Sequence, residues 1–545
     1  MTYTIEKVTT LIGARRYGDN DTNIGFILTD SRSLCFPEET LFFALKSERN
    51  DGHNYIPELY RRGVKNFVVT DVPKGYASDY PEANFLKVVN TLEALQRLAE
   101  RHRDEFNIPI VGITGSNGKT MVKEWLYQLL SPSMFVTRSP RSYNSQIGVP
   151  LSVWLMNEQT QVGVFEAGIS QPGEMLALRD IIQPTIAVLT NVGAAHQENF
   201  SSMEEKCREK LILFHDAETI VYDGDDELVT KTIAEYQDFK GEKLFWSQKN
   251  AEAPFYVKSI EKQQSVTVIT YIYKGEEDSF SIPFIDDASI QNSIVCAVVA
   301  SKLGLSAEDI DKRMSTLEPV AMRLEVKVGQ HGCTLINDSY NSDINSLDIA
   351  LDFMNRRPDH RGRRHTLILS DIFQSGETPE QLYKEVSDLA RKRGVVKFIG
   401  IGPELCKQSD EIQIHEKFFF HNVEEFIDSE VFKSLRDEVI LLKGARQFGF
   451  DQLTELLVQK VHETTLEVNL NAVVANLNYY RAFMKPETKL VCMIKADGYG
   501  AGAVEIAKTL QDHRVDYLAV AVADEGVTLR KNGITSNIMI MNPEM

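Results

Sequence analysis

The chain has 545 residues, of which 43% are hydrophobic and 25% charged, and its formal net charge at pH 7 is −19. This length predicts several domains rather than one. The acidic balance argues against a nucleic-acid partner, because an acidic surface repels phosphate backbones. The first residues lack the apolar core of a signal peptide, and no run approaches the ~18 apolar residues of a membrane span. The six scattered cysteines form no C-x-x-C pair, so we expect a cytoplasmic protein with reduced thiols.

The first 104 residues predict a small α/β domain. Residues 24–29, 41–45 and 66–70 have the apolar character of strands, and residues 56–63 that of a helix. The sequence Asp30-Ser31-Arg32 directly follows the first strand. By itself this tripeptide indicates no more than a turn with a capping carboxylate.

A phosphate-binding loop is the clearest motif. The apolar run 108–113 predicts a buried strand, and residues 121–130 have helical spacing. Between them the backbone N–H groups of a glycine-rich turn can face an anion, a lysine can reach terminal phosphates and a threonine hydroxyl can ligate Mg²⁺. The strict G-x-x-x-x-G-K-[ST] pattern is not met, because Ile113 stands where its first glycine would. The predicted ATP-binding residues are Gly115, Ser116, Asn117, Gly118, Lys119 and Thr120.

Two later strand ends supply candidate metal ligands. The strand 162–166 ends in Glu166, and His196 lies just beyond the strand and turn of residues 186–193. Taken singly, Glu166 is compatible with a helix cap and His196 with a structural histidine. The alternation of strands and helices predicts a doubly wound parallel sheet, whose ligands bind at the carboxyl ends of the strands. Glu166 and Thr120 are therefore the predicted hard-oxygen ligands of Mg²⁺.

The rest of the chain predicts three further regions. Residues 220–284 are expected to form a strand-rich insert, and residues 317–458 a third α/β domain in which Asp338 follows a strand. Residues 490–494 then predict a buried strand that ends at Lys495, before a glycine-rich turn. A lysine at a strand mouth suits Schiff-base chemistry, because desolvation lowers its pKa.

These motifs resemble those of the Mur ligases and their folylpolyglutamate synthase relatives. The resemblance rests on Thr114–Thr120, Tyr143–Pro150, the sequence from Asn191 to His196, and Ile336–Ser342. It implies a three-domain α/β fold: a small N-terminal domain (1–104), a central P-loop ATPase domain with a parallel sheet (105–316) and a C-terminal Rossmann-like domain (317–458).

The resemblance also implies site residues. The implied contacts to the UDP-linked substrate are Ser31, Arg32 and Asn144, together with Lys443 and Arg446 of a late K-G-A-R segment. Asn292, Arg323 and Asp338 would contact ATP, with Arg323 meeting the γ-phosphate. His196 would contact a second Mg²⁺ together with Lys210, which carries a CO₂-derived carbamate in this family. By composition alone, Lys210 belongs to a solvated helix face, and its offset from His196 favours it over Lys206. Departures from the family pattern stand at Lys46, Ser47, Gln291, Ala321 or Met322, Asp343, Ile344, Ser370 and Gln374.

Residues 367–377 resemble the segment typical of the branch that adds D-alanyl-D-alanine to UDP-N-acetylmuramoyl-tripeptide, and the D-N-P-R signature of the branch adding the third residue is absent. The implied partners are those two substrates, and the ligase part is expected to be monomeric. Three alternatives stay open: another amino-acid-adding Mur ligase, a folylpolyglutamate synthase-like ligase, and an inactive scaffold that keeps the fold.

The last segment resembles a different family. The sequence K-A-D-G-Y-G-A-G, from Lys495, resembles the pyridoxal-phosphate motif of alanine racemases, with Lys495 and Tyr499 as the implied cofactor residues. Their (β/α)₈ barrel needs about 250 residues, so residues 465–545 predict an incomplete barrel that is inactive as truncated. Pyridoxal phosphate and a homodimer are expected only in the full-length racemase.

Overall fold

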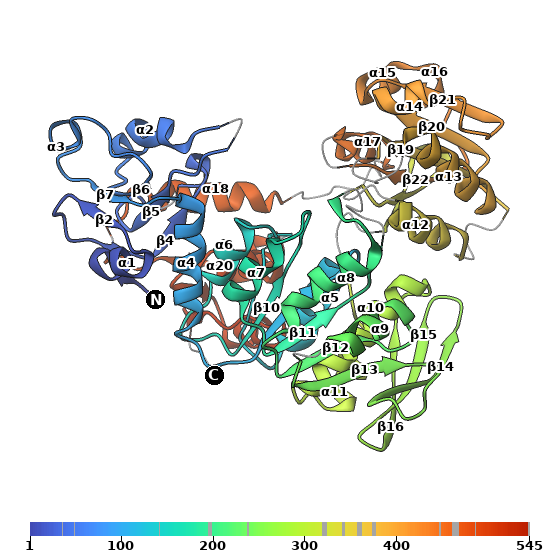
Figure 1. Ribbon diagram of the computed structural model, residues 1–545, viewed down its shortest axis with the longest axis horizontal. Coiled ribbons are helices and arrows are strands. Elements are labelled where there is room, and N and C mark those ends of the chain that lie inside the picture. Colours follow the sequence, from blue (N-terminus) through green and yellow to red (C-terminus); the bar gives the residue numbers. More distant parts are fainter. Residues whose placement is uncertain are drawn as a thin grey trace.

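The computed structural model describes the chain except for residues 35, 48–49, 141, 194–198, 237–238, 319–323, 340–343, 357–361, 373–377, 446–447, 460–467, 486 and 543–545. The described part contains sheets of five, nine, six and three strands and a short two-stranded ribbon, arranged as Figure 1 shows. Within the described residues, no helix combines the length and apolar character that a membrane crossing needs. The five described cysteines form no disulfide.

The N-terminal sheet has the strand order β2-β7-β6-β5-β4, and all neighbours are parallel except β2 and β7. Apolar side chains line both faces, so β5 and β6 are fully buried. The strands are β2 (Arg15–Tyr17), β4 (Phe26–Leu28), β5 (Thr40–Phe43), β6 (Asn66–Val69) and β7 (Asn84–Lys87). The ribbon pairs β1 (Tyr3–Thr4) with β3 (Asn23–Ile24), and the helices are α1 (Ile5–Ile12), η1 (Ser31–Ser33), η2 (Gly52–Tyr55), α2 (Ile56–Arg61), α3 (Tyr76–Asp79) and α4 (Thr91–Arg103).

The central sheet has the order β16-β15-β14-β13-β12-β11-β8-β10-β9, and its strands from β14 to β9 are parallel. The parallel strands are β8 (Ile110–Thr114), β9 (Val136–Arg138), β10 (Val162–Glu166), β11 (Ile186–Leu189), β12 (Thr219–Asp223), β13 (Glu242–Ser247) and β14 (Phe255–Lys262). Separate apolar cores cover its two faces. The helices are α5 (Lys119–Leu130), α6 (Gly148–Val153), α7 (Glu174–Ile182), α8 (Met203–Leu211), η4 (Ile212–Phe214), α9 (Glu227–Glu235), α10 (Asp287–Lys302) and α11 (Ala307–Met314).

The region predicted as a strand-rich insert, residues 220–284, is rich in strands and forms part of this sheet. The strands β12, β13 and β14 continue the parallel order. The strands β15 (Thr267–Tyr273) and β16 (Glu276–Ile282) then close the edge as antiparallel neighbours. The alternation between residues 255 and 273 correctly indicated strands, but it contained no sign of which sheet they would join.

The third sheet has the order β17-β18-β22-β19-β20-β21, with only β17 antiparallel. Its strands are β17 (Glu325–Val328), β18 (Thr334–Asn337), β19 (Arg364–Ser370), β20 (Lys397–Ile401), β21 (Glu416–Phe420) and β22 (Glu438–Lys443). Helices cover both faces: α12 (Ile344–Arg356), α13 (Pro379–Lys392), α14 (Pro403–Lys407), α15 (Val423–Asp428), α16 (Glu430–Lys433) and α17 (Phe450–Leu457), with η5 (Gln330–Gly332) between β17 and β18. This body stands apart from the central sheet at the upper right of Figure 1.

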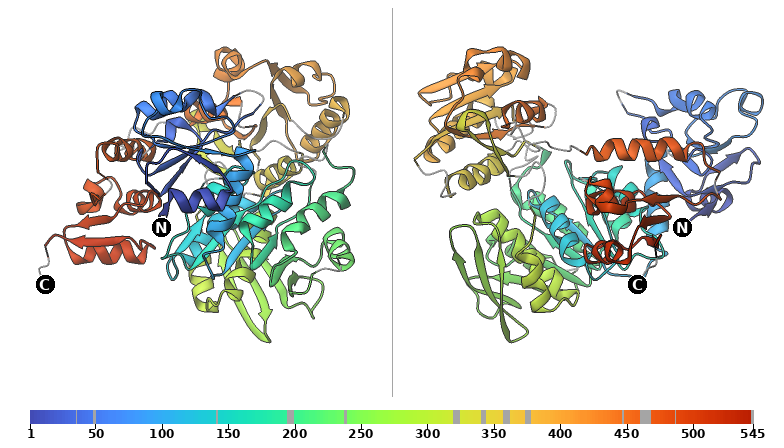
Figure 2. Two further views of the ribbon diagram at one scale, coloured as in Figure 1. Left: turned by 60° about the vertical axis from the view of Figure 1, so that its left-hand side comes forward. Right: turned by 180° about the vertical axis from the view of Figure 1, so that it is seen from behind.

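The last described segment alternates strands and helices around a three-stranded parallel sheet, β23-β24-β25. Its elements are α18 (Leu470–Arg481), β23 (Val491–Met493), α19 (Lys495–Tyr499), α20 (Ala503–Asp512), β24 (Tyr517–Val520), α21 (Ala523–Lys531) and β25 (Asn537–Ile540). Figure 2 shows this segment, in red, beside both the N-terminal and the central sheets. There Arg514 donates a hydrogen bond to the Trp154 carbonyl, and the Arg481 guanidinium lies over the Phe36 ring.

Aromatic side chains join the N-terminal and central bodies. Trp154, just after α6, donates its indole N–H to the Gly25 carbonyl and packs against Tyr3 and His102. His102 lies 2.9 Å from the Tyr3 hydroxyl and 3.1 Å from the Met156 carbonyl. Burial lowers the pKa of His102 to about 3, so its ring is neutral at physiological pH. This joint is a packed core rather than a free linker.

Candidate active site

The glycine-rich loop between β8 and α5 is shaped by two glycines in left-handed conformations. Gly115 has φ +144° and Gly118 has φ +83°. A Cβ at Gly115 would lie 1.9 Å from the Thr190 hydroxyl, and one at Gly118 would lie 2.4 Å from Asn292 Oδ1. Only glycine fits either position, because a side chain would be strained and would collide.

The end of the neighbouring strand β11 fixes this loop. The backbone N–H of Ser116 donates to the Asn191 carbonyl, and the N–H of Asn117 donates to Asn191 Oδ1 at 2.9 Å. The Ser116 hydroxyl and the Gly193 backbone also exchange hydrogen bonds. Residues 190–193 therefore hold the loop in shape from the carboxyl edge of the sheet.

Lys119 and Thr120 open helix α5 at the mouth of the loop. The Lys119 ammonium folds back and donates to the carbonyls of Gly115 at 2.7 Å and Ser116 at 3.1 Å. Thr120 donates its hydroxyl to Glu166 Oε2 at 3.1 Å. A cation and a hydroxyl thus meet at a helix N-terminus, which favours anions.

Glu166 ends β10 and is fully buried, as expected for a carboxylate in the crevice of a parallel sheet. Its Oε2 accepts from Thr120 and from the Asn144 amide at 3.4 Å. Its Oε1 is buried and has no hydrogen-bond partner among the described residues. A buried carboxylate oxygen beside a threonine hydroxyl fits the few hard protein ligands that Mg²⁺ takes.

Lys123, which the sequence analysis did not single out, lies on the other side of Glu166. Its ammonium is 3.2 Å from Glu166 Oε1, and neither side chain is exposed. The residue lies in α5 between the buried Val122 and Trp125. A charged residue among apolar helix positions was the only signal that could have identified it.

Lys210 lies in α8 behind the loop and is buried, contrary to the solvated face that composition indicates. Its ammonium donates to the Gly115 carbonyl at 3.3 Å. Burial lowers its pKa well below the ordinary value, and the charges of Lys119 and Lys206 lower it further. Lys206 is also buried and donates to the Gly193 carbonyl.

Three predicted site residues, His196, Arg323 and Arg446, lie outside the described residues. Across the described part of the chain, no group of three or more His, Cys, Asp or Glu side chains could hold a metal ion. Of the predicted metal ligands, Thr120 and Glu166 lie among the described residues, and the Thr120 hydroxyl is 3.1 Å from Glu166 Oε2.

A second candidate site is a pocket of about 860 Å³ on the N-terminal body. Ser31 and Arg32 line it, as does Lys46 after β5, and Ile147 contributes from the central body. Arg32 forms a bidentate contact with Asp30, which lowers the pKa of that carboxyl. The exposed guanidinium nevertheless adds positive charge at the rim.

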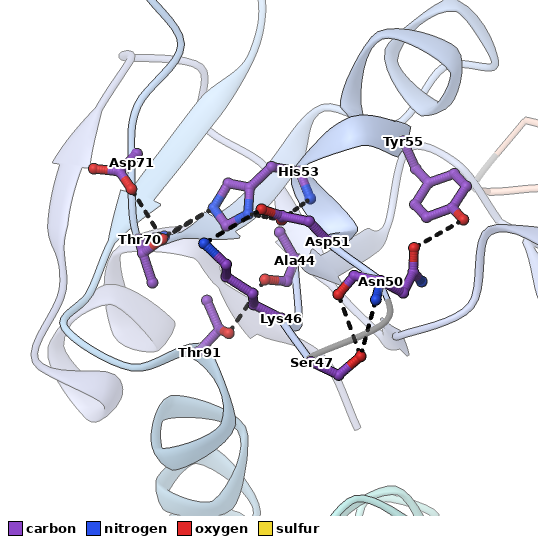
Figure 3. Close-up of polar contacts among 10 residues, drawn as sticks. All are labelled: Ala44, Lys46, Ser47, Asn50, Asp51, His53, Tyr55, Thr70, Asp71 and Thr91. Atoms are coloured by element: carbon purple, nitrogen blue, oxygen red, sulfur yellow. Dashed lines mark hydrogen bonds and ion pairs between the residues drawn. The ribbon is translucent and has the colours of Figure 1, made fainter.

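A polar network supports the floor of this pocket (Figure 3). The Thr70 backbone N–H donates to His53 Nε2 at 3.1 Å, so the proton of the neutral ring is on Nδ1, which donates to Asp51 at 2.6 Å. Lys46 lies 3.7 Å from the same carboxylate. His53 is thus a structural residue that fixes Asp51.

In the third body, the structure brings Asp338 and Lys443 together. Asp338 follows β18 and Lys443 ends the neighbouring strand β22, so both stand at the carboxyl edge of the sheet. Their charged groups are 2.7 Å apart. Asn292, in α10, packs against the loop at Gly118.

Comparison with known proteins assigns both parts of the chain. Residues 113–300 match the family model for the Mur ligase middle domain, and residues 468–545 match that for the alanine racemase N-terminal domain. Residues 113–300 are a Mur ligase middle domain. The UDP-N-acetylmuramoyl-tripeptide–D-alanyl-D-alanine ligase of Bacillus subtilis is 29% identical over 371 residues, which cover 67% of this chain and 77% of that protein.

Solved structures share the fold of the Mur ligase part. MurF from Acinetobacter baumannii has a TM-score of 0.72 at 21% identity, covering 84% of this chain and 99% of that one. MurF from Thermotoga maritima, solved in complex with ADP, has a TM-score of 0.67 at 22% identity and covers 82% and 97%. The predicted fold class, a three-part Mur ligase followed by part of a racemase barrel, is confirmed.

In the racemase segment, Lys495 directly follows β23 and begins a left-handed turn. Ala496, Asp497 and Tyr499 have φ between +51° and +60°, and Glu525 accepts the Ala496 N–H at 2.6 Å. The prediction that the preceding strand is buried is wrong: β23 is exposed or half-buried, and Lys495 and Tyr499 are exposed. The apolar character of residues 490–494 could not show which neighbouring segments would cover the strand.

Proposed function

We propose that the Mur ligase part joins D-alanyl-D-alanine to UDP-N-acetylmuramoyl-tripeptide at the expense of ATP, in cytoplasmic peptidoglycan precursor synthesis. The observation that carries the proposal is the arrangement at the loop mouth, where Thr120 donates to the buried carboxylate of Glu166 and Lys119, the preceding residue, faces the loop carbonyls. The activity printed for the Bacillus subtilis relative supports the choice of substrates, and the ADP bound by the Thermotoga maritima MurF supports the choice of nucleotide.

We assign the substrates to three domains. Residues 1–104 would hold the UDP end in the 860 Å³ pocket, where Ser31 and Arg32 offer a hydroxyl and a cation to the diphosphate. Residues 105–316 would bind ATP, and residues 317–458 would close over it. Asn144, Lys443 and Arg446 are the remaining proposed contacts to the peptide substrate.

Each loop residue has a proposed task toward ATP. The backbone from Gly115 to Gly118 cradles the phosphates and Lys119 turns from its carbonyl partners onto them, while Arg323 meets the γ-phosphate. Asn292 and Asp338 contact the nucleoside. Thr120 and Glu166 would hold one Mg²⁺, and His196 with a carbamylated Lys210 a second. When bound, Mg²⁺ neutralises phosphate charge and so favours phosphoryl transfer. The lowered pKa of Lys210 favours the neutral amine, which is the form that reacts with CO₂.

The reaction then proceeds in two transfers. The tripeptide's terminal carboxylate attacks the γ-phosphorus of ATP, giving an acyl phosphate and ADP. The amine of D-alanyl-D-alanine attacks the carbonyl carbon, the new amide forms, and inorganic phosphate leaves with the bonding electrons. The protein contributes positioning and charge stabilisation, which dominate catalysis of phosphoryl transfer.

The test measures phosphate release with ATP, Mg²⁺ and UDP-N-acetylmuramoyl-tripeptide, with and without D-alanyl-D-alanine. We expect release to require the dipeptide, to accompany formation of the pentapeptide, and to disappear in Lys119→Ala. Lys249→Ala, an exposed lysine beyond β13, is the matched control and should keep full activity. Release with a different acceptor would transfer the assignment to a sister ligase, and the absence of phosphate release with every acceptor would support the scaffold alternative.

We propose that residues 465–545 are part of an alanine racemase that binds pyridoxal phosphate only as the full-length racemase and is inactive as truncated. Lys495 stands exposed at the carboxyl end of β23, next to the left-handed turn that carries Tyr499, and this placement fits a lysine that meets an aldehyde. When bound, pyridoxal phosphate supplies an electron sink for removal of the α-proton. A racemase would supply D-alanine, from which the dipeptide substrate is made. We expect the full-length racemase to be a homodimer and the ligase part to be monomeric.

A further inference from the structure

Lys123 places a cation in the buried interior directly behind the proposed metal ligand. Its ammonium lies 3.2 Å from Glu166 Oε1 and 2.8 Å from Glu124 Oε1, and it donates to the Ser139 carbonyl at 2.9 Å. The ammonium thus lies near two carboxylate oxygens and one backbone carbonyl oxygen. The side chain is therefore held in one place despite the cost of burying a charge.

The same site holds Glu166 from two further directions. Thr120 donates to its Oε2, and the Ser139 hydroxyl accepts its backbone N–H at 3.2 Å. Ser139, the residue after β9, thus contacts both Lys123 and Glu166. Its carbonyl accepts from the Lys123 ammonium, and its hydroxyl accepts from the Glu166 backbone N–H. Lys123 faces the other carboxylate oxygen, Oε1, which has no hydrogen bond of good geometry among the described residues.

A second carboxylate fixes Lys123 from behind. Glu124 Oε2 accepts from Arg138 Nε at 3.1 Å, and the Arg138 guanidinium lies 3.7 Å from the centre of the Tyr127 ring. Lys123 is one of two cations on Glu124, so its ammonium cannot move far toward Glu166. The charge of Lys123 therefore orients Glu166 Oε1, while this oxygen stays available to a second cation.

We propose that Lys123 is a positioning residue for the metal site: it orients the Glu166 carboxylate so that Oε1 receives the Mg²⁺ that accompanies ATP. This inference rests on the proposed ATP-dependent function and deepens it. It concerns metal affinity, so it is separable from the identity of the amino-acid acceptor. Without the ammonium, the carboxylate would turn toward Thr120 and Asn144, whose hydrogen bonds to Oε2 would then be its main restraints.

The test is the Mg²⁺ dependence of ADP binding, measured by titration calorimetry on the whole chain in wild type and Lys123→Met. Residues that orient metal ligands typically affect metal affinity by about 10- to 100-fold, and we expect the half-saturating Mg²⁺ concentration to rise within that range. ADP binding without metal should keep its affinity. Lys397→Met is the matched control, because Lys397 is an equally buried lysine paired with Glu438 in the third body, and its Mg²⁺ dependence should equal that of wild type.

A double-mutant cycle with Glu166→Gln separates positioning from folding. If Lys123 acts through Glu166, adding Lys123→Met to Glu166→Gln should not change the Mg²⁺ dependence further. Lys123→Gln keeps hydrogen-bond donors near Ser139, and the same Mg²⁺ titration is made on this variant if Lys123→Met fails to fold. A variant that loses stability but keeps the wild-type Mg²⁺ dependence would overturn the proposal. Failure of the ligase assignment would instead appear as absent pentapeptide formation with Mg²⁺-dependent ADP binding intact.

Discussion

Lys443 and Asp338 form a buried ion pair across two neighbouring strands, with Lys443 Nζ 2.7 Å from Asp338 Oδ2. The parallel register of β18 and β22 aligns Asn337 with Leu442, so the next residue on each strand stands at the same height. The family resemblance implies different ligands for the two residues, ATP for Asp338 and the UDP-linked substrate for Lys443. Their pairing means that each fixes the position of the other before any ligand arrives.

Removing the lysine should therefore destabilise the third body. Lys443→Met would leave Asp338 buried without its cation, and breaking a buried pair typically costs about 3–5 kcal/mol. Denaturant unfolding followed through this body should show that loss. Lys433→Met is the matched control, since Lys433 is 59% exposed and forms a surface pair with Glu430; it should change little. Full stability in Lys443→Met would show that the pair is not a structural element.

The sequence was most informative where local chemistry determines structure. The loop from Thr114 to Thr120 required a strand before it and a helix after it, and β8 and α5 stand there. The placement of Glu166 followed from a general property of parallel sheets, whose strand ends converge. The roles of these residues stay predictions.

The sequence was least informative where burial depends on distant neighbours. Lys123 and Lys210 are lysines in helices, a setting in which composition indicates exposure, yet tertiary packing buries both. The strands β14 to β16 were recognisable, whereas their union with the central sheet was not. For the same reason the exposed setting of β23 was missed, because burial depends on residues that do not adjoin the strand in sequence.

Lys210 should carry CO₂ in the active enzyme. Its buried amine has a strongly lowered pKa and lies against the loop at Gly115. We expect ¹³C-labelled bicarbonate to give a carbamate NMR signal that Lys210→Met abolishes, with a ligation rate about 10- to 100-fold lower. Lys206→Met, which removes the neighbouring buried lysine, should keep the signal. The opposite pattern would assign the modification to Lys206.

His102 should make the joint between the N-terminal and central bodies sensitive to acid. Its folded-state pKa is about 3, against 6.5 for an ordinary histidine. Between these values the unfolded chain binds more protons, so the stability that the neutral ring contributes is present above pH 6.5 and is lost as the pH falls toward 3. Relative to His102→Gln, wild type should lose about 1.4 kcal/mol per pH unit below 6. Thermal unfolding scans from pH 7 to 5 measure this difference, and parallel curves for the two proteins would contradict it.

We expect Arg514 to contribute more than Asp512 to the free energy with which the racemase segment packs against the ligase part. Asp512 lies 4.0 Å from Arg138 and is 48% exposed, and such surface pairs contribute about 0–1 kcal/mol. Arg514 instead donates to the Trp154 carbonyl at 3.1 Å, and burial lowers its pKa to about 10. Loss of a buried, charge-assisted hydrogen bond typically costs about 1–3 kcal/mol.

Hydrogen exchange in α6, which lies next to Trp154, measures the docking. Arg514→Met should accelerate exchange there by about tenfold or more, because 1.4 kcal/mol corresponds to a factor of ten in an equilibrium constant. Asp512→Asn, a substitution two residues away, should produce a change of less than about fivefold. Equal effects of the two substitutions would mean that the ion pair with Arg138 contributes as much as the buried contact, despite its length and exposure. The helix α5, which carries both Lys119 and the Glu124 partner of Arg138, should then also respond to Asp512→Asn.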